Sequence, residues 1–375
     1  MPSPAPAPRR IAVSAPQFQG NEWKYVQECL ESTWVSSIGR FIPLFEGQFA
    51  AYCEVEYAVA TNNGTSALHL ALLGMGVGPG DEVIVPTLTF VATANAVTYC
   101  GAKPVFVDSE PRTMNLDPAR LEAAITTRTK GILAVHLYGH PADMDAIAEV
   151  AKRHGLFVVE DAAEAHGALY KGRKVGGLAD AGTFSFFGNK IITTGEGGMV
   201  TLRDAERMAR IRLYRGQGMQ QDRRYWFPVV GYNYRMTNIQ AALGLAQLEQ
   251  IARYTEHHRR VAGWYAEQLG PVGKALQLPV EEAWARHAYW LYTVVLGPGV
   301  AVERDAVMAG LAEVGIETRP VFYPMHVMEP YYEGRGRYPV AERLSERGIS
   351  LPTHVGLTEE DVRYIAGQLR RLCGL

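Results

Sequence analysis

Residues 57–75, Tyr57-Ala-Val-Ala-Thr-Asn-Asn-Gly64-Thr-Ser-Ala-Leu-His-Leu-Ala-Leu-Leu-Gly-Met75, decide the fold of this 375-residue chain. The stretch begins with an apolar run of strand length, passes through a polar loop that contains a glycine, and enters an apolar segment of helical length. This order directs free backbone N–H groups and the positive end of a helix dipole at the loop. Gly64, Thr65 and Ser66 are therefore candidate phosphate ligands, although a Thr or Ser that only caps the helix fits the pattern equally well.

The alternation of strand and helix continues along the chain on the C-terminal side of this stretch. Short runs of mostly apolar residues are separated by segments with helical spacing, which is typical of a largely parallel sheet covered on both faces. Ligands of such sheets bind at the carboxyl ends of the strands. The predicted strands are 82–85, 103–107, 131–136, 156–160, 182–186 and 198–202, and the predicted helices are 89–99, 118–125, 144–154 and 205–213.

Asp161 falls at the carboxyl end of one predicted strand, in Leu156-Phe-Val-Val-Glu-Asp161-Ala-Ala-Glu-Ala-His166. A carboxylate that follows a buried apolar strand is costly unless it is paired. It is interpreted either as an N-cap of the next segment or as the partner of a buried cation. Glu164 and His166 are expected to flank the same pocket, His166 in a structural role.

Lys190 lies in a short apolar run, Thr183-Phe-Ser-Phe-Phe-Gly-Asn-Lys190-Ile-Ile-Thr-Thr-Gly-Glu-Gly-Gly198. Apolar surroundings lower the pKa of a lysine, and the neutral amine is the nucleophile that forms a Schiff base with a carbonyl. Ser185 has a hydroxyl that could bind an anionic group. The segment between Asp161 and Lys190 has room for one short hairpin and a strand, so both side chains can reach one pocket. The alternative is a surface lysine between two strands.

The second half of the chain predicts a smaller domain. Thr237 is expected to cap a long helix that runs to about Leu269 and links the domains, and Thr358 to cap a closing helix at 359–372. The predicted division is a disordered proline-rich tail over 1–12, a large domain over 13–250 and a small C-terminal α+β domain over 251–375.

Composition excludes several classes of function. A formal net charge of −2 gives no electrostatic reason to expect nucleic acid or an anionic membrane as a partner. The 4 cysteines are far apart and form no CxxC, so neither a metal site nor a redox pair is predicted. No apolar run approaches the ~18 residues that span a bilayer, and the N-terminus lacks the pattern of a signal peptide. A cytoplasmic enzyme is the expectation.

Taken together, these motifs resemble those of the DegT/DnrJ/EryC1/StrS family of sugar aminotransferases. The resemblance extends from about Trp34 to the closing helix. It is carried by Asn63-Gly-Thr-Ser-Ala-Leu68, Glu160-Asp-Ala-Ala-Glu164, Ser185-Phe-Phe-Gly-Asn-Lys190 and Gly231-Tyr-Asn-Tyr-Arg-Met236. It implies the aspartate-aminotransferase (type I) fold, an α/β fold with a mostly parallel mixed sheet, and pyridoxal 5′-phosphate as cofactor.

The resemblance also implies roles for individual residues. Lys190 would hold the cofactor as a Schiff base and then move the proton, and Asp161 would keep the pyridine nitrogen protonated. Phe90 matches the position that stacks on the ring, and Glu164 matches a polar position beside it. Gly64, Thr65, Ser66 and Ser185 would bind the phosphate. Asn233 matches a residue that reaches the phosphate of the neighbouring subunit, which implies a homodimer with shared active sites.

The substrates implied are L-glutamate and a nucleotide-linked keto sugar. The segments around Lys190 and over 225–231 look most like members that aminate C4 of GDP-4-keto-6-deoxymannose, and Tyr323 and His326 are candidates for the sugar-side wall. A 3-keto sugar or a dTDP- or UDP-linked sugar stays open. A related sugar dehydratase has histidine where Lys190 stands, and a non-enzymatic protein with a vestigial site conflicts with an intact Lys190, Asp161 and Ser185.

Overall fold

A seven-stranded sheet forms the centre of the computed structural model, which describes residues 10–220 and 222–375. The strand order is β1-β9-β8-β5-β4-β2-β3, and β9 is the one strand of this sheet that runs against its neighbours. The predicted fold class, α/β with a mostly parallel mixed sheet, is confirmed. The strands are β1 (Tyr57–Thr61), β2 (Glu82–Pro86), β3 (Lys103–Val107), β4 (Thr129–Val135), β5 (Phe157–Asp161), β8 (Ala181–Ser185) and β9 (Gly198–Leu202).

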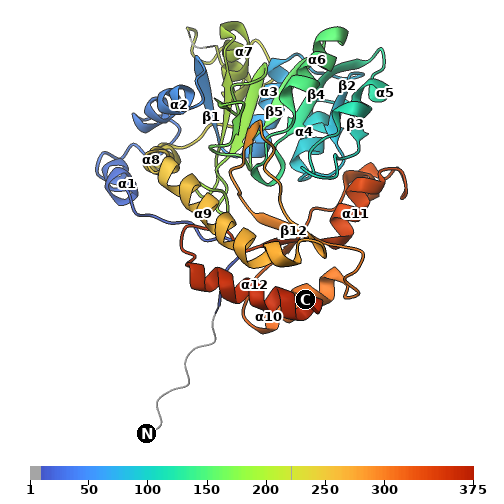
Figure 1. Ribbon diagram of the computed structural model, residues 1–375. Coiled ribbons are helices and arrows are strands. Elements are labelled where there is room, and N and C mark those ends of the chain that lie inside the picture. The colour runs from blue at the N-terminus through green and yellow to red at the C-terminus, as the bar shows by residue number, and fades with distance from the viewer. Residues whose placement is uncertain (1–9, 221) are drawn as a thin grey trace.

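Helices cover both faces of this sheet (Figure 1). Alternate residues of β4 show the two faces, since Leu133 and Val135 belong to one apolar core while Ile132 and Ala134 belong to another. The first core includes α2 (Phe41–Tyr52), α3 (Gly64–Gly74), α4 (Ala92–Tyr99) and α8 (Asn238–Leu248). The second includes α5 (Leu121–Ala124) and α6 (Met144–His154). Helices α1 (Glu22–Glu31) and α7 (Ala205–Arg215) pack against α8 and α3 respectively, and each adds one buried residue to the first core, Cys29 and Ile211.

The long helix predicted from Thr237 to Leu269 is two helices, α8 and α9 (Ile251–Leu269), so that prediction was wrong in its continuity. No glycine or proline stands at the break. Residues of α8 pack into the core of the large sheet, whereas Val261 and Tyr265 of α9 pack into a separate core, and tertiary packing outweighs helix propensity here. Thr237 does cap α8, in a capping box with Gln240, as expected.

A third apolar core surrounds a four-stranded antiparallel sheet with the order β10-β12-β14-β13. Figure 1 shows this sheet region below the large sheet, with α9, α10 and α12 around it. Thr358 caps α12 in a capping box with Asp361, which confirms the predicted start. The elements are β10 (Leu276–Gln277), β12 (Tyr292–Leu296), β13 (Arg319–Pro320), β14 (Gly348–Leu351), α10 (Arg304–Glu313), α11 (Pro339–Arg347) and α12 (Glu359–Cys373).

The beginning of the described chain joins this smaller unit. Ile11 is buried in its core, and its backbone bonds Gly315 and Glu317. Of the tail predicted over 1–12, residues 1–9 lie outside the described residues. The boundary predicted between 250 and 251 falls at the break between α8 and α9 and stays a prediction. In the described part of the chain, no helix has the length and apolar character needed to cross a membrane.

Candidate functional site

A cavity of about 410 Å³ opens at the carboxyl ends of the parallel strands, between the large sheet and the smaller unit. Both units supply its walls. The large-sheet side contributes Asn63, Gly64, Thr65, Leu68, Thr89, Phe90, Ala92, Val135, Tyr138, Asp161, Ala163, Glu164, Ser185, Phe187, Asn189, Lys190 and Glu196, and the other side contributes Trp290, Leu291, Arg319, Pro320, Phe322 and Ser350.

The N-terminus of α3 forms one wall of this cavity. Asn63 caps the helix, because its side-chain oxygen accepts a hydrogen bond from the Ser66 N–H at 2.8 Å. The N–H groups of Gly64 and Thr65, at the first turn, have no partner inside an α-helix and are available to an anion. A Cβ at Gly64 would lie 2.7 Å from the Cβ of Ser185, so only glycine lets the two backbones approach this closely.

Asp161, the last residue of β5, is a buried carboxylate with hydrogen bonds but no ion pair. Its Oδ2 accepts from the Thr93 hydroxyl at 2.9 Å, and its Oδ1 accepts from the Ala163 N–H at 3.2 Å. None of the ion pairs within residues 10–220 and 222–375 includes it. Burial raises the pKa of Asp161, and the Thr93 bond opposes this. Among the described residues no cation lies within ion-pair distance of Asp161, although the charge of Lys190 favours its ionised form.

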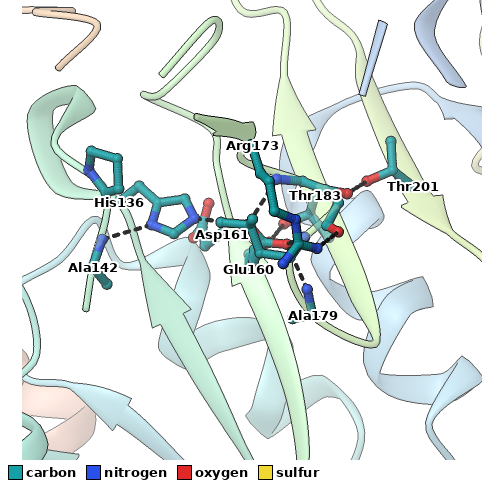
Figure 2. Close-up of polar contacts among 12 residues, drawn as sticks. His136, Ala142, Glu160, Asp161, Arg173, Ala179, Thr183 and Thr201 are labelled. Carbon is teal, nitrogen blue, oxygen red and sulfur yellow. Dashed lines mark hydrogen bonds and ion pairs between the residues drawn. The ribbon is translucent and has the colours of Figure 1, made fainter. Parts of the chain in front are cut away.

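Glu160, the residue before Asp161, fixes the end of β5 from the opposite face (Figure 2). Its Oε2 accepts from the Gly176 N–H at 2.7 Å and pairs with His136 Nε2 at 3.1 Å, and its Oε1 accepts from two further backbone N–H groups. His136 Nδ1 accepts from the Ala142 N–H at 3.0 Å, so the proton of the neutral ring lies on Nε2, which donates to Glu160. Every carboxylate oxygen of this fully buried residue is satisfied.

Lys190 extends into the cavity from the loop after β8. Its Nζ lies 3.6 Å from Glu164 Oε1 and 3.7 Å from the centre of the Trp290 ring, and its side chain is 11% exposed. Burial lowers the pKa of the ammonium, while the charges of Glu164 and Asp161 act in the opposite direction. The lysine is therefore a buried amine whose pKa lies below that of an exposed lysine, in the direction that its apolar sequence surroundings predict.

Glu164 lies between Lys190 and an unusual backbone turn. Its Oε2 accepts from the Tyr138 N–H at 2.8 Å, and Tyr138 has a φ of 54°, a left-handed conformation that is rare outside glycine. Burial raises the pKa of Glu164 to about 7, with Lys190 opposing the shift. The Tyr138 hydroxyl accepts from the Phe322 N–H at 3.1 Å, so this turn joins the carboxylate to the smaller unit.

Some of the predicted site residues lie outside the cavity wall of this single chain. The Ser66 hydroxyl instead donates to Asn62 Oδ1 and to the Asn63 carbonyl, within the first turn of α3. His326 is fully buried between Thr87 and Glu342. The remaining residues that do not line the cavity are Tyr323, which is exposed, Asn233, whose Oδ1 accepts from Arg235 Nε at 3.2 Å, and His166, which packs on two phenylalanine rings.

Several residues in the cavity wall, and Thr93 behind it, were missed by sequence reasoning. Thr93 follows Thr89 by one helical turn, which is a signal that could have placed its hydroxyl beside Asp161. Asn189 directly precedes Lys190, but nothing in the sequence pattern indicated a role for its side chain. Trp290 and Arg319 come from the smaller unit, and no periodicity in the sequence indicates which of its side chains face a cavity.

The comparisons with known proteins agree with this geometry. GDP-perosamine synthase from Caulobacter vibrioides is 58% identical over 361 residues, which cover 96% of this chain and 97% of that protein. The Escherichia coli O157:H7 enzyme of the same name is 49% identical, over 95% of this chain and 96% of its own. The putative sugar aminotransferase Spr1654 from Streptococcus pneumoniae, solved in its PLP form, superposes with a TM-score of 0.92 at 29% identity, covering 98% of this chain and 99% of that one.

A family model matches nearly the whole described chain. The match extends over residues 16–370 and so includes the N-terminus of α3, the strand end at Asp161, the segment around Lys190 and most of the smaller unit. The chain belongs to the DegT/DnrJ/EryC1/StrS aminotransferase family.

Proposed function

We propose that this protein is a pyridoxal 5′-phosphate-dependent aminotransferase that moves an amino group from L-glutamate to C4 of GDP-4-keto-6-deoxymannose and so makes GDP-perosamine. The observation that carries the reaction type is the placement of Lys190, a buried lysine in one cavity with the unpaired carboxylate of Asp161 and the free N–H groups of α3. The 58% identity to the Caulobacter vibrioides synthase supports the choice of sugar.

The residues present fit the cofactor. A phosphate suits the N–H groups of Gly64 and Thr65 with the Ser185 hydroxyl, at the positive end of the α3 dipole. A protonated pyridine nitrogen is the cation that the buried Asp161 carboxylate lacks within the described chain. When bound, pyridoxal 5′-phosphate supplies an aldehyde that takes up the amino group and a ring that stabilises negative charge.

Lys190 and Glu164 perform the proton chemistry in this proposal. Lys190 Nζ would hold the cofactor, and its amine, once free, would serve as the base for the proton of the reacting carbon. Glu164, 3.6 Å away, has a pKa raised to about 7, so it can take up or release a proton near neutral pH. Trp290 covers Nζ and restricts water on that side.

Asp161 sets the charge of the ring in this proposal, and its neighbours keep it in place. The Thr93 hydroxyl and the Ala163 N–H orient the two carboxylate oxygens. The Glu160–His136 contact fixes the strand end behind them. These residues act by position, since the reaction needs the carboxylate aligned before substrate enters.

A homodimer with shared sites is part of the proposal. The loop that carries Asn233 lies beside the N-terminus of α3, because the Asn62 N–H donates a hydrogen bond to the Tyr234 carbonyl at 2.9 Å. Large apolar side chains of the same loop are exposed, including Trp226, Phe227 and Val230, the last at 88%. An exposed apolar surface beside a site supports an interface, and a second copy would bring its own Asn233 toward this phosphate site.

The proposal is tested by turnover with L-glutamate and a panel of keto sugars. The panel holds GDP-4-keto-6-deoxymannose, a dTDP-linked and a UDP-linked 4-keto sugar, and a 3-keto sugar. We expect kcat/KM for the GDP-linked 4-keto sugar to exceed the others by about 100-fold or more, as pockets that hydrogen-bond a substrate discriminate strongly. Equal or better turnover of another sugar refutes the proposed acceptor, and the absence of amino transfer to every sugar refutes the proposed reaction.

A further inference from the structure

Arg319 is the second cation in the wall of the cavity. Among the described residues that line it, Lys190 and Arg319 are the basic ones, and Arg319 belongs to the smaller unit. It lies on β13, where antiparallel pairing with Ser350 of β14 fixes its position in the sheet, and Ser350 lines the cavity as well. The guanidinium is near enough to contribute to the lowered pKa of Lys190.

The guanidinium of Arg319 is weakly engaged by the protein. Its one ion pair within the described residues is with Glu317, where Nη2 and Oε1 are 3.9 Å apart and both side chains are about half exposed, at 47% and 51%. The other oxygen of Glu317 accepts from the Val13 N–H at 3.3 Å. A guanidinium has five N–H donors in a planar fork, so most of its bonding capacity is available to a ligand.

The amino donor of the proposed reaction needs such a group. Asp161, Glu164 and Glu196 also line the cavity, so the carboxylates of a glutamate that enters would meet acidic side chains. A carboxylate taken out of water requires a paired cation. Lys190 cannot pair with the donor carboxylate throughout the reaction, because its amine takes part in the covalent exchange. Arg319 is the remaining cation of this chain in the cavity wall.

We propose that Arg319 selects the amino donor by binding a carboxylate of L-glutamate in a bidentate ion pair while the donor amine reaches the position of Lys190. The inference rests on the proposed function and adds to it the residue that recognises the donor. A planar fork fits a carboxylate with two parallel hydrogen bonds. The keto sugar that follows in the same cavity has no carboxylate to pair, so the effect of Arg319 belongs to the first half of the reaction.

The experiment separates the two half-reactions of the loaded enzyme in the variants Arg319→Gln and Arg319→Lys. The first half-reaction is followed by cofactor absorbance with L-glutamate alone, and the second with the keto sugar alone after amination. We expect Arg319→Gln to raise the KM for glutamate about 10- to 100-fold, as the loss of a charged hydrogen-bond pair does. The KM of Arg319→Lys for glutamate should lie between those of wild type and Arg319→Gln, because an ammonium keeps the charge but lacks the planar fork of donors. The KM for the keto sugar should stay within about 3-fold.

A binding measurement without turnover gives a second readout. Glutarate, which has two carboxylates and no amine, is titrated calorimetrically into the loaded wild type and variants. We expect its Kd to rise with Arg319→Gln in parallel with the KM for glutamate. Arg363→Gln, which removes a similarly exposed arginine paired with Glu359 on α12, is the matched control and should leave both values unchanged.

The outcomes are distinguishable. A rise in the KM for the keto sugar with unchanged glutamate and glutarate binding would overturn the proposal and assign Arg319 to the sugar nucleotide. Glu317→Gln should preserve or strengthen glutamate binding, and a loss equal to that of Arg319→Gln would mark the ion pair as structural and also overturn it. If wild type converts glutamate but aminates no GDP-linked sugar, the proposed acceptor fails while the assignment of Arg319 stands.

Discussion

Lys190 is one of several lysines in the chain, and its surroundings distinguish it from an exposed one such as Lys103. We predict that borohydride reduction of the loaded protein leaves a pyridoxyl group on Lys190, located by peptide mass spectrometry. Lys190→Ala should lower amino transfer about 1,000-fold or more, because the covalent attachment and the proton acceptor are lost together. Lys103→Ala serves as control, and a label found on any other lysine would contradict the assignment.

The raised pKa of Glu164 predicts how the stability of the protein changes with pH. Its pKa in the folded protein is about 7, above the ordinary value of 4.5, so between these values the folded chain holds a proton that the unfolded chain has released. The contribution of Glu164 to stability is therefore present below pH 4.5 and is lost as pH rises through 7. In the cofactor-free protein, wild type should lose about 3 kcal/mol relative to Glu164→Gln between pH 4 and 8.

Urea unfolding at a series of pH values tests this difference. The variant is the matched control, since the amide occupies nearly the same volume and does not titrate. Parallel stability curves for the two proteins would mean that the pKa of Glu164 is the same in the folded and unfolded chains, and that the Lys190 charge cancels the desolvation that burial imposes.

At the scale of elements, the end of β5 depends on Glu160. Three backbone N–H groups and His136 donate to its carboxylate. Glu160→Gln places an amide NH₂ against those donors, and we expect a loss of about 3 kcal/mol in the free energy of unfolding. Cofactor affinity should fall as well, because Asp161 follows directly in the strand. Glu149→Gln on α6, whose side chain is 75% exposed, should change stability by less than about 0.5 kcal/mol.

Two glycines in helices give a matched pair of substitutions. A Cβ at Gly64 would lie 2.7 Å from the Ser185 Cβ, whereas a Cβ at Gly47 in α2 meets nothing within 4 Å. We predict that Gly64→Ala weakens cofactor binding at least 10-fold by displacing Ser185, a loss of about 1.4 kcal/mol. Gly47→Ala should stabilise the protein by up to about 1 kcal/mol and leave cofactor binding unchanged. Unaltered cofactor affinity in Gly64→Ala would show that Ser185 is not a phosphate ligand.

The elements were predictable where local pattern decides them. The strands at Tyr57–Thr61 and Gly198–Leu202 and the caps at Thr237 and Thr358 follow from alternation and capping chemistry. The break at Glu249 and Gln250 was not predictable, because no local residue marks it; α9 begins against the core of the large sheet at Ile251 and Tyr254 and enters the separate core only at Val261. Ser66 shows the same limit, since the sequence does not indicate whether its hydroxyl binds a phosphate or, as here, donates to the Asn63 carbonyl within the first turn of α3.

At the scale of the whole molecule, shared sites predict complementation between inactive chains. Lys190→Ala and Asn233→Asp are mixed under conditions that allow subunit exchange, provided each is inactive alone. If Asn233 completes the site of the partner, one site in each mixed dimer carries both defects and the other carries neither, and activity should partly return. Analytical ultracentrifugation of the mixture checks that dimers have formed.

The outcome that contradicts sharing is equally clear. If exchange is demonstrated with tagged chains and activity does not return, Asn233 acts only within its own loop, where its Oδ1 accepts from Arg235. A monomeric protein with full activity would contradict both the shared site and an interface at the apolar loop around Trp226 and Val230.

Only part of the site could be predicted from the sequence. Residues of the large sheet were predicted, whereas those of the smaller unit that line the cavity were not. Asp161 ends β5, and Lys190 lies in the loop that follows β8, the parallel neighbour of β5, so the carboxyl ends of two adjacent strands bring them together. Trp290 and Arg319 reach the cavity from a different sheet, and the sequence holds no information on how the two units close over each other. Tyr323 and His326 were chosen from that unit by motif, and neither lies in the cavity wall.

The contact between Lys190 and Trp290 also means that the fluorescence of this tryptophan can be used to measure cofactor binding. The lysine amine lies 3.7 Å from the centre of the indole ring, so a chromophore attached there is next to an intrinsic fluorophore. Excitation of the indole passes to such a neighbour instead of being emitted. The emission of Trp290 therefore reports, without any added dye, what fraction of the chains is loaded, and Trp290→Phe gives the background of the other tryptophans.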